Sequence, residues 1–324
     1  MDPLTTLSLP SILKLTPRFR EVVWGGRRLE PEFGKPIPAG KPVGEAFELS
    51  AVQGMEALVS EGPLAGRSIS ELILEFGPQL TGIDTAEKYG ADFPLLVKWL
   101  DAQGDLSIQV HPDDEYVRRE DLGRFGKSEA WYVVRSENGR VAAGLKNGAG
   151  VDDLRRAIEE GHVEDIVVYH DVSPGDIVCI PPGTVHALCG GVMVYEVQQS
   201  SDVTFRLYDY NRSQPDGSLR ELHVEQGLAV TDPSVDATPS RVEAVRQVTT
   251  EHFTLDRFNP TDAHAHDPVP SFSAVTLLHG TADLQADGLS STATAGQTFL
   301  IPAQRGFTVK PQEECEYLIA TVPP

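Results

Sequence analysis

Two side chains that could bind a metal ion, Gln109 and His111, stand two residues apart and alternate with apolar residues. Ser107 continues the same alternation toward the N-terminus. Side chains two apart on a strand share one face, so the pattern predicts a strand with three polar groups on that face. If the face lines a barrel interior, two of these groups could hold one ion. An edge strand with a solvated polar face is the alternative, and the segment alone does not decide between them.

A second pair of polar residues, Lys127 and Glu129, is also two residues apart and is followed by aromatic residues. A buried carboxylate requires a compensating charge, which a divalent cation would supply. Lys127 would then lie close enough to contact a substrate or to donate a proton. The Gly-Lys-Ser sequence at 126–128 resembles the end of a phosphate-binding loop, but the first glycine of that motif would fall at Asp121, which excludes nucleotide binding of this kind.

His186 follows a short apolar run and a tight turn. The segment begins at Gly175, continues through Pro181 and a Pro-Gly pair, and places the histidine three residues after Gly183. This spacing resembles the second conserved motif of cupin barrels, and the Gln-x-His at residue 109 stands where their first motif usually has two histidines. A purely structural role for His186 is the alternative.

These residues together offer two imidazole nitrogens, one carboxylate oxygen and one amide oxygen to a cation. Zinc suits such a mixed set, and a catalytic zinc site keeps one position open for water or substrate. Nickel, cobalt, iron or manganese could also occupy it. A neutral amide ligand leaves the ion more electrophilic, which suits polarisation of a sugar carbonyl or hydroxyl group.

The elements that must position these residues are short apolar or alternating runs, which predict strands. Their number and spacing favour a mainly β fold with two cupin-like, jelly-roll barrels and a few helices around the first barrel. Helices are predicted within 68–80 and from Asp152 to about Gly161. The predicted strands of the first part are 93–100, 106–110, 130–134, 141–145, 176–181, 192–197 and 204–208.

A segment rich in Pro, Thr, Ser and Asp near 230–245 predicts a linker. It divides the chain into a catalytic domain at 1–235 and a C-terminal domain at 236–324. In the second domain 296–302 echoes 175–181, but no histidine follows, so this domain is predicted to lack a metal. His264 and His266 stand in a loop-like context, and we expect no metal ion there. The predicted strands are 253–258, 273–278, 297–301 and 317–322.

Acidic residues outnumber basic ones by 48 to 27, which gives a formal charge of −21. This charge disfavours binding to nucleic acids and to anionic membrane surfaces. It would also repel a sugar phosphate, so any phosphate-binding pocket must concentrate lysine and arginine locally. No apolar run reaches the length of a membrane span, and three cysteines in no metal or redox motif suggest reduced thiols. We expect a cytoplasmic protein, a monomer or weak homo-oligomer.

Across residues 20 to about 230 the sequence resembles the type I mannose-6-phosphate isomerases, especially their short bacterial form. The blocks that carry the resemblance are 23–26, 44–50, 93–98, 106–114, 126–132, 181–187 and 195–210. The resemblance implies that Gln109, His111, Glu129 and His186 bind one zinc ion per chain. It further implies that Arg206 is catalytic, that Lys127, Glu196 and Asp202 line the substrate pocket, and that Ser107 lies at its phosphate end. Phe47 departs from the family, which usually has Trp at this position.

The resemblance implies conversion between mannose 6-phosphate and fructose 6-phosphate through an enediol, with Glu196 or Lys127 moving the proton. For Glu196 a solvated face, and for Arg206 an ion pair with Asp202 or Asp209, are the structural alternatives. Lys98 could reach the pocket or extend to solvent, and Trp131 is interpreted as a core aromatic residue. A cupin metalloenzyme acting on another substrate, including an oxygenase, and a non-catalytic sugar-binding cupin remain alternative functions.

Overall fold

Antiparallel strands form most of the computed structural model, which describes residues 8–214 and 216–324. Its described strands make two seven-stranded sheets, one five-stranded sheet and one four-stranded sheet. The prediction of a mainly β fold is therefore confirmed. None of the helices in the described residues is long and apolar enough to cross a membrane.

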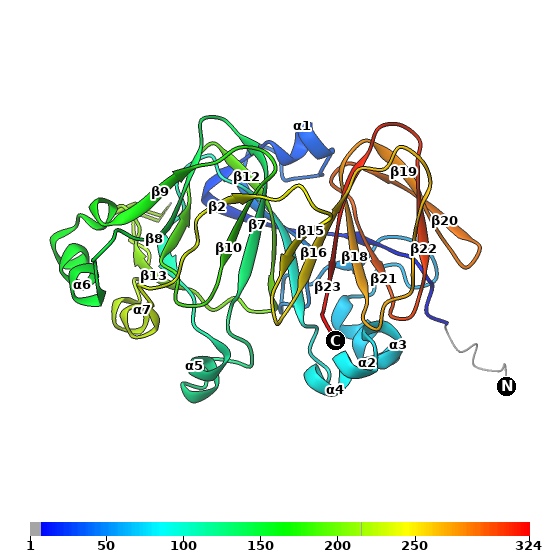
Figure 1. Ribbon diagram of the computed structural model, residues 1–324, viewed down its shortest axis with the longest axis horizontal. Coiled ribbons are helices and arrows are strands. Elements are labelled where there is room, and N and C mark those ends of the chain that lie inside the picture. Colours follow the sequence, from blue (N-terminus) through cyan, green and yellow to red (C-terminus); the bar gives the residue numbers. More distant parts are fainter. Residues whose placement is uncertain (1–7, 215) are drawn as a thin grey trace.

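Eight consecutive strands in the first part of the chain pair in jelly-roll order. The sheet that contains β10-β7-β12-β5 faces the sheet that contains β6-β11-β8-β9, so successive strands mostly change sheets (Figure 1). The eight strands are β5 (Leu95–Asp101), β6 (Ile108–Val110), β7 (Glu129–Ser136), β8 (Arg140–Leu145), β9 (Val167–Asp171), β10 (Asp176–Ile180), β11 (His186–Leu188) and β12 (Val192–Gln199).

A second set of eight strands repeats this order. The neighbours β21-β18-β23-β16 correspond to β10-β7-β12-β5, and β17-β22-β19-β20 correspond to β6-β11-β8-β9. Figure 1 shows this set in orange and red beside the first, mostly green, set. The strands are β16 (Thr254–Phe258), β17 (His264–His266), β18 (Ser273–His279), β19 (Thr281–Ala286), β20 (Leu289–Thr294), β21 (Thr298–Ile301), β22 (Phe307–Pro311) and β23 (Glu316–Thr321).

The remaining strands extend the sheets across the predicted domain boundary. β1, near the N-terminus, pairs with β21 of the second set, and β14 pairs with β10 of the first. The segment predicted to be a linker therefore contains a strand, and the division at residue 235 stays a prediction. These strands are β1 (Leu13–Thr16), β2 (Arg18–Gly26), β3 (Val43–Leu49), β4 (Leu58–Val59), β13 (Phe205–Tyr208), β14 (Ser240–Arg241) and β15 (Arg246–Thr249).

The helices are short and lie outside the sheets. The structure divides the helix predicted at 68–80 into two helices at Gly77, where φ is +44°. The second of these, α3 (Pro78–Thr81), contacts the second set of strands, because the Ala303 N–H donates a hydrogen bond to the Leu80 carbonyl. The helix predicted from Asp152 is confirmed and ends before Gly161. The helices are α1 (Leu29–Phe33), α2 (Ile69–Phe76), α3 (Pro78–Thr81), α4 (Ile83–Tyr89), α5 (Asp114–Arg119), α6 (Val151–Glu160), α7 (Val224–Val230) and a 3₁₀ turn (Val163–Asp165).

One local prediction was wrong. His264 and His266 lie in strand β17, which pairs with β22, and not in a loop. Their Asp, Ala and Pro neighbours suggested a turn, but the backbone hydrogen bonds to β22 impose the extended conformation. Tertiary pairing here overrides a weak local preference.

Candidate metal centre and adjoining cleft

Strand pairing aligns three predicted site residues from distant parts of the sequence. On β6, Gln109 is in register with His186 of β11 on one side and with Arg206 of β13 on the other. Residues directly opposite one another on antiparallel strands project from the same face. The predicted polar face of β6 is therefore part of a continuous row across three strands.

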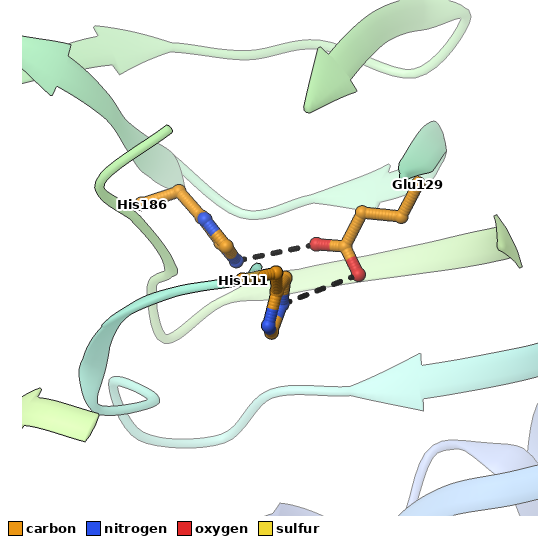
Figure 2. A group of neighbouring side chains, drawn as sticks. All are labelled: His111, Glu129 and His186. Carbon is orange, nitrogen blue, oxygen red and sulfur yellow. Dashed lines mark ion pairs between the residues drawn. The ribbon is translucent and has the colours of Figure 1, made fainter. Parts of the chain in front are cut away.

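His111, Glu129 and His186 form a fully buried cluster at the end of this row. Their potential ligand atoms all lie within 4.8 Å of one another. His186 Nε2 is 3.2 Å from Glu129 Oε1, and His111 Nε2 is 3.6 Å from Glu129 Oε2. Figure 2 shows the two imidazole rings approaching the two carboxylate oxygens separately. The three potential metal-ligand groups therefore face one small space.

The hydrogen bonds and protonation states of the cluster are compatible with cation binding. His186 Nδ1 lies 2.9 Å from the Thr184 carbonyl oxygen and donates to it, which leaves the Nε2 lone pair directed at the cluster. Both Glu129 carboxylate oxygens are buried without an accepted hydrogen bond. Burial lowers the pKa of His111 to about 3, so its imidazole is neutral at pH 7. A neutral imidazole and an ionised carboxylate are the forms that bind metals.

Glu129 also has Lys127 as a neighbour, with its Nζ 2.8 Å from Oε2. Burial alone would raise the pKa of Glu129, but the charge of Lys127 and the neighbouring imidazoles of His111 and His186 hold it well below its ordinary value. Gln109 completes the group, because its Nε2 lies 3.2 Å from His186 Nε2 and 3.5 Å from His111 Nε2. A half-turn of this amide would exchange its nitrogen and oxygen and present the oxygen to the same space.

A cleft of about 230 Å³ adjoins the cluster and contains the other predicted residues. Ser107, Gln109, Lys127, Glu196, Asp202 and Arg206 all line it. Basic residues are concentrated there, although the whole protein is strongly acidic. Those lining the cleft are Arg20, Lys98, Lys127, Arg206 and Arg220. The local concentration of cations that an anionic ligand would need is therefore present.

Arg206 does not form the predicted alternative ion pair. No carboxylate of the described residues lies within 4.0 Å of its guanidinium, and Asp209 instead pairs with Arg212 and Arg220. Its Nη1 donates to the Glu221 carbonyl at 2.9 Å, while its buried Nε has no partner among residues 8–214 and 216–324. Burial and the charge of Arg220 lower the pKa of Arg206.

Glu196 is 2% exposed, which excludes the solvated-face alternative. Trp131 Nε1 donates to its Oε1 at 3.0 Å, and Lys98 Nζ lies 3.2 Å from its Oε2. Burial raises the pKa of Glu196. Trp131 is buried as predicted, but its hydrogen bond gives it a polar role that the sequence did not suggest.

Four charged residues of the cleft were absent from the predicted site: Arg20, Glu45, Lys98 and Arg220. Lys98 is 3% exposed, so it lies inside the protein and does not extend to solvent. Its register opposite Glu196 on β12 could not be read from either segment alone. The sequence offered one indication that Lys98 belongs to the site, which is that this lysine stands within a run of large apolar residues.

The fold and the site define a jelly-roll protein with a buried candidate metal centre at the end of a cleft lined by basic residues. Comparison with known families gives a match to "Phosphomannose isomerase type I, catalytic domain" over residues 12–139. The chain is 34% identical to the probable mannose-6-phosphate isomerase GmuF of Bacillus subtilis (strain 168), over 95% of this chain and 98% of that protein. It is 32% identical to mannose-6-phosphate isomerase ManA of the same organism, over 92% and 96%.

A crystal structure of the mannose 6-phosphate isomerase from Bacillus subtilis superposes with a TM-score of 0.86 at 32% identity, covering 97% of this chain and all of the other. The chain therefore belongs to the type I mannose-6-phosphate isomerase family. The phosphomannose isomerase of Salmonella typhimurium, at 14% identity and a TM-score of 0.79, shares the fold.

Proposed function

We propose that this chain interconverts mannose 6-phosphate and fructose 6-phosphate, with one zinc ion held by Gln109, His111, Glu129 and His186. One observation carries the proposal: the buried His/Glu/His cluster adjoins a cleft in which Arg206 has a buried, unpartnered Nε. A candidate cation site and an anion-binding group thus lie at the same cleft. The names of the full-length relatives support the choice of substrate.

The donor set fits zinc. Two imidazoles and one carboxylate are common ligands of catalytic zinc, and Glu129 Oε1 accepts no hydrogen bond from the described residues. When bound, the ion would act as a Lewis acid toward the sugar oxygens at C1 and C2. Lys127, beside Glu129, would supply a further positive charge to these oxygens.

The proton between C1 and C2 must be removed and returned through an enediol, which requires a base at the cleft. We assign this role to Glu196, because burial raises the pKa of its carboxyl group toward neutral pH. Trp131 and Lys98 orient the carboxylate. Lys127 then acts on the oxygens, and Asp202 contacts the sugar hydroxyls from the rim.

The phosphate end of the substrate requires cationic hydrogen-bond donors. Arg206 and Arg220 provide guanidinium groups in the cleft, and Ser107 adds a hydroxyl from the residue before β6. Paired guanidinium groups suit phosphate oxygens because they offer several N–H donors in a fixed plane. The C1 end would then lie toward the cluster.

The proposal is tested with metal-analysed protein in coupled assays on mannose 6-phosphate, glucose 6-phosphate and other hexose phosphates. We expect turnover of mannose 6-phosphate, about one zinc ion per chain, loss of activity on chelation and recovery on addition of zinc. Metal-free protein that isomerises at the full rate would refute the metal-dependent mechanism. Binding of the sugar phosphate without turnover, at full metal occupancy, would favour a non-catalytic sugar-binding protein.

A further inference from the structure

Arg20 connects two walls of the cleft. It lies on β2, and its Nη1 is 3.2 Å from Glu45 Oε2 on the neighbouring strand β3. Its Nη2 donates to Asp202 Oδ2 at 3.0 Å, across 182 residues of sequence. Its guanidinium also lies over the Phe47 ring, 4.7 Å from the centroid. Three contacts in different directions therefore hold this side chain in one orientation.

Asp202 depends on this contact. It lies in the segment 200–204, between β12 and β13, which has no regular secondary structure. Among the described residues, Arg20 is the one hydrogen-bond donor to the Asp202 carboxylate. The Gln198 amide holds the neighbouring backbone by donating to the Ser201 carbonyl at 2.7 Å. Arg20 thus determines where the Asp202 side chain stands at the rim.

Glu45 links Arg20 to the interior of the site. Lys98 Nζ lies between Glu45 Oε1, at 3.6 Å, and Glu196 Oε2, at 3.2 Å. Lys98 also lies over the same Phe47 ring as Arg20, 4.8 Å from the centroid. Without Arg20, Glu45 and Glu196 would compete for the single Lys98 cation, because a buried carboxylate without a partner is unfavourable.

We propose that Arg20 is a positioning residue of the isomerase site, which holds Asp202 at the rim and, by neutralising Glu45, keeps Lys98 on Glu196. This inference rests on the proposed function. Arg20 acts through Asp202, Glu45 and Lys98 and takes no part in proton transfer. A lysine cannot replace it fully, because one ammonium group does not reproduce the planar fork that reaches two carboxylates.

The test compares steady-state kinetics of Arg20→Ala and Arg20→Lys with those of the parent enzyme. Arg18→Ala is the matched control, because Arg18 is exposed on the same strand and its removal changes the net charge equally. We expect Arg20→Ala to lower kcat about tenfold with KM changed by less than about threefold, Arg20→Lys to be intermediate, and added guanidinium to restore part of kcat. A rise in KM alone, or kinetics equal to those of Arg18→Ala, would overturn the proposal.

A double-mutant cycle separates this inference from the proposed function. In kcat, Arg20→Ala and Asp202→Asn should be non-additive, because each removes the same contact. The same cycle in thermal unfolding midpoints needs no activity, and we expect a non-additive shift of about 1 °C or more. If the parent protein does not isomerise the sugar phosphate, the proposed function fails. Additive shifts in the unfolding midpoint would separately refute the proposed positioning of Asp202 by Arg20. If Arg20→Ala does not fold, Arg20→Lys replaces it in both cycles.

Discussion

Arg206 has more hydrogen-bonding capacity than the protein itself uses. Its Nη1 binds the Glu221 carbonyl and its backbone N–H donates to His223 Nδ1, so the strand and the side chain are both held in place. Its Nε nevertheless has no partner, although it is buried. An unpaired buried donor is unfavourable unless a ligand satisfies it. The proposed contact of Arg206 with the substrate rests on this unpaired donor together with its place in the cleft.

We therefore expect Arg206→Lys to lower kcat/KM by about 100-fold, because lysine keeps the charge but loses the Nε donor and the planar fork. Zinc content should stay near that of the parent, since Arg206 is not one of the proposed ligands. Steady-state assays and metal analysis measure both quantities. Arg155→Lys, at an exposed ion pair with Glu225, is the control. Equal kcat/KM in the two variants would remove Arg206 from the site.

At the scale of elements, the turn between β10 and β11 connects two of the proposed ligands. Gly183 in this turn donates its N–H to the His111 carbonyl at 2.9 Å, and its own carbonyl accepts from the Asp232 N–H at 3.0 Å. Its φ is +87°, and a Cβ would lie 3.1 Å from the Val230 carbonyl oxygen. Both conformation and space therefore require glycine at this position.

Gly183→Ala should destabilise the protein and weaken zinc binding about tenfold or more, because the turn must move and His186 moves with it. Gly148→Ala is the matched control: its φ is +85°, but nothing lies within 4 Å of the added Cβ. The control should lose about 1 kcal/mol in the free energy of unfolding and no zinc affinity. Urea denaturation and zinc titration distinguish the two effects. Equal zinc affinity in both variants would show that crowding at Gly183 does not reach the ligands.

At the scale of the whole molecule, the second set of strands repeats the arrangement of the first without its ligands. Gly175 and Gly296 begin equivalent segments, and eleven residues later the first has His186 where the second has Phe307. Glu129 lies opposite Ile180 on the neighbouring strand. Ile301 is the equivalent of Ile180, and it lies opposite Ser273. His266 faces Phe307 in the register in which Gln109 faces His186. Of these three equivalents of the proposed ligands, His266 alone carries a common metal-binding group.

The environment of His266 makes the stability of this part of the molecule depend on pH. Burial, followed by the charge of His264, lowers the pKa of His266 from 6.5 to about 4, and its Nε2 is 2.9 Å from the Tyr317 hydroxyl. Between these two values the unfolded chain binds a proton that the folded protein does not. The free energy of unfolding should therefore fall as the pH is lowered from 7 toward 4.

The variant His266→Gln should lose this contribution, about 1 kcal/mol between pH 7 and pH 5 after allowance for solvent screening. Urea denaturation at both pH values measures the difference, and His279→Gln, at an exposed histidine, serves as the control. A parent and a His266→Gln variant with the same pH dependence would contradict the expectation.

Local patterns in the sequence predicted eleven of the described strands and the helix at 152–161, and they suggested the four proposed metal ligands. Alternation with a period of two places Gln109 and His111 on one face, and the glycine-proline turn before His186 is a local signal. The family resemblance added Arg206, Lys127, Glu196, Asp202 and Ser107. All nine residues come together in the structure, although their individual roles stay proposals.

Only the tertiary structure decided which charges meet. The contacts of Arg20 with Asp202 and of Lys98 with Glu196 join segments separated by 182 and 98 residues, and they depend on strand register and on the path of an irregular segment. A change of one residue in register would turn these side chains to the opposite face of the sheet. The same holds for β17, where pairing with β22 overrode a turn-like sequence. Alternation along one strand indicates which side chains share a face, but the neighbouring strand determines what that face contacts.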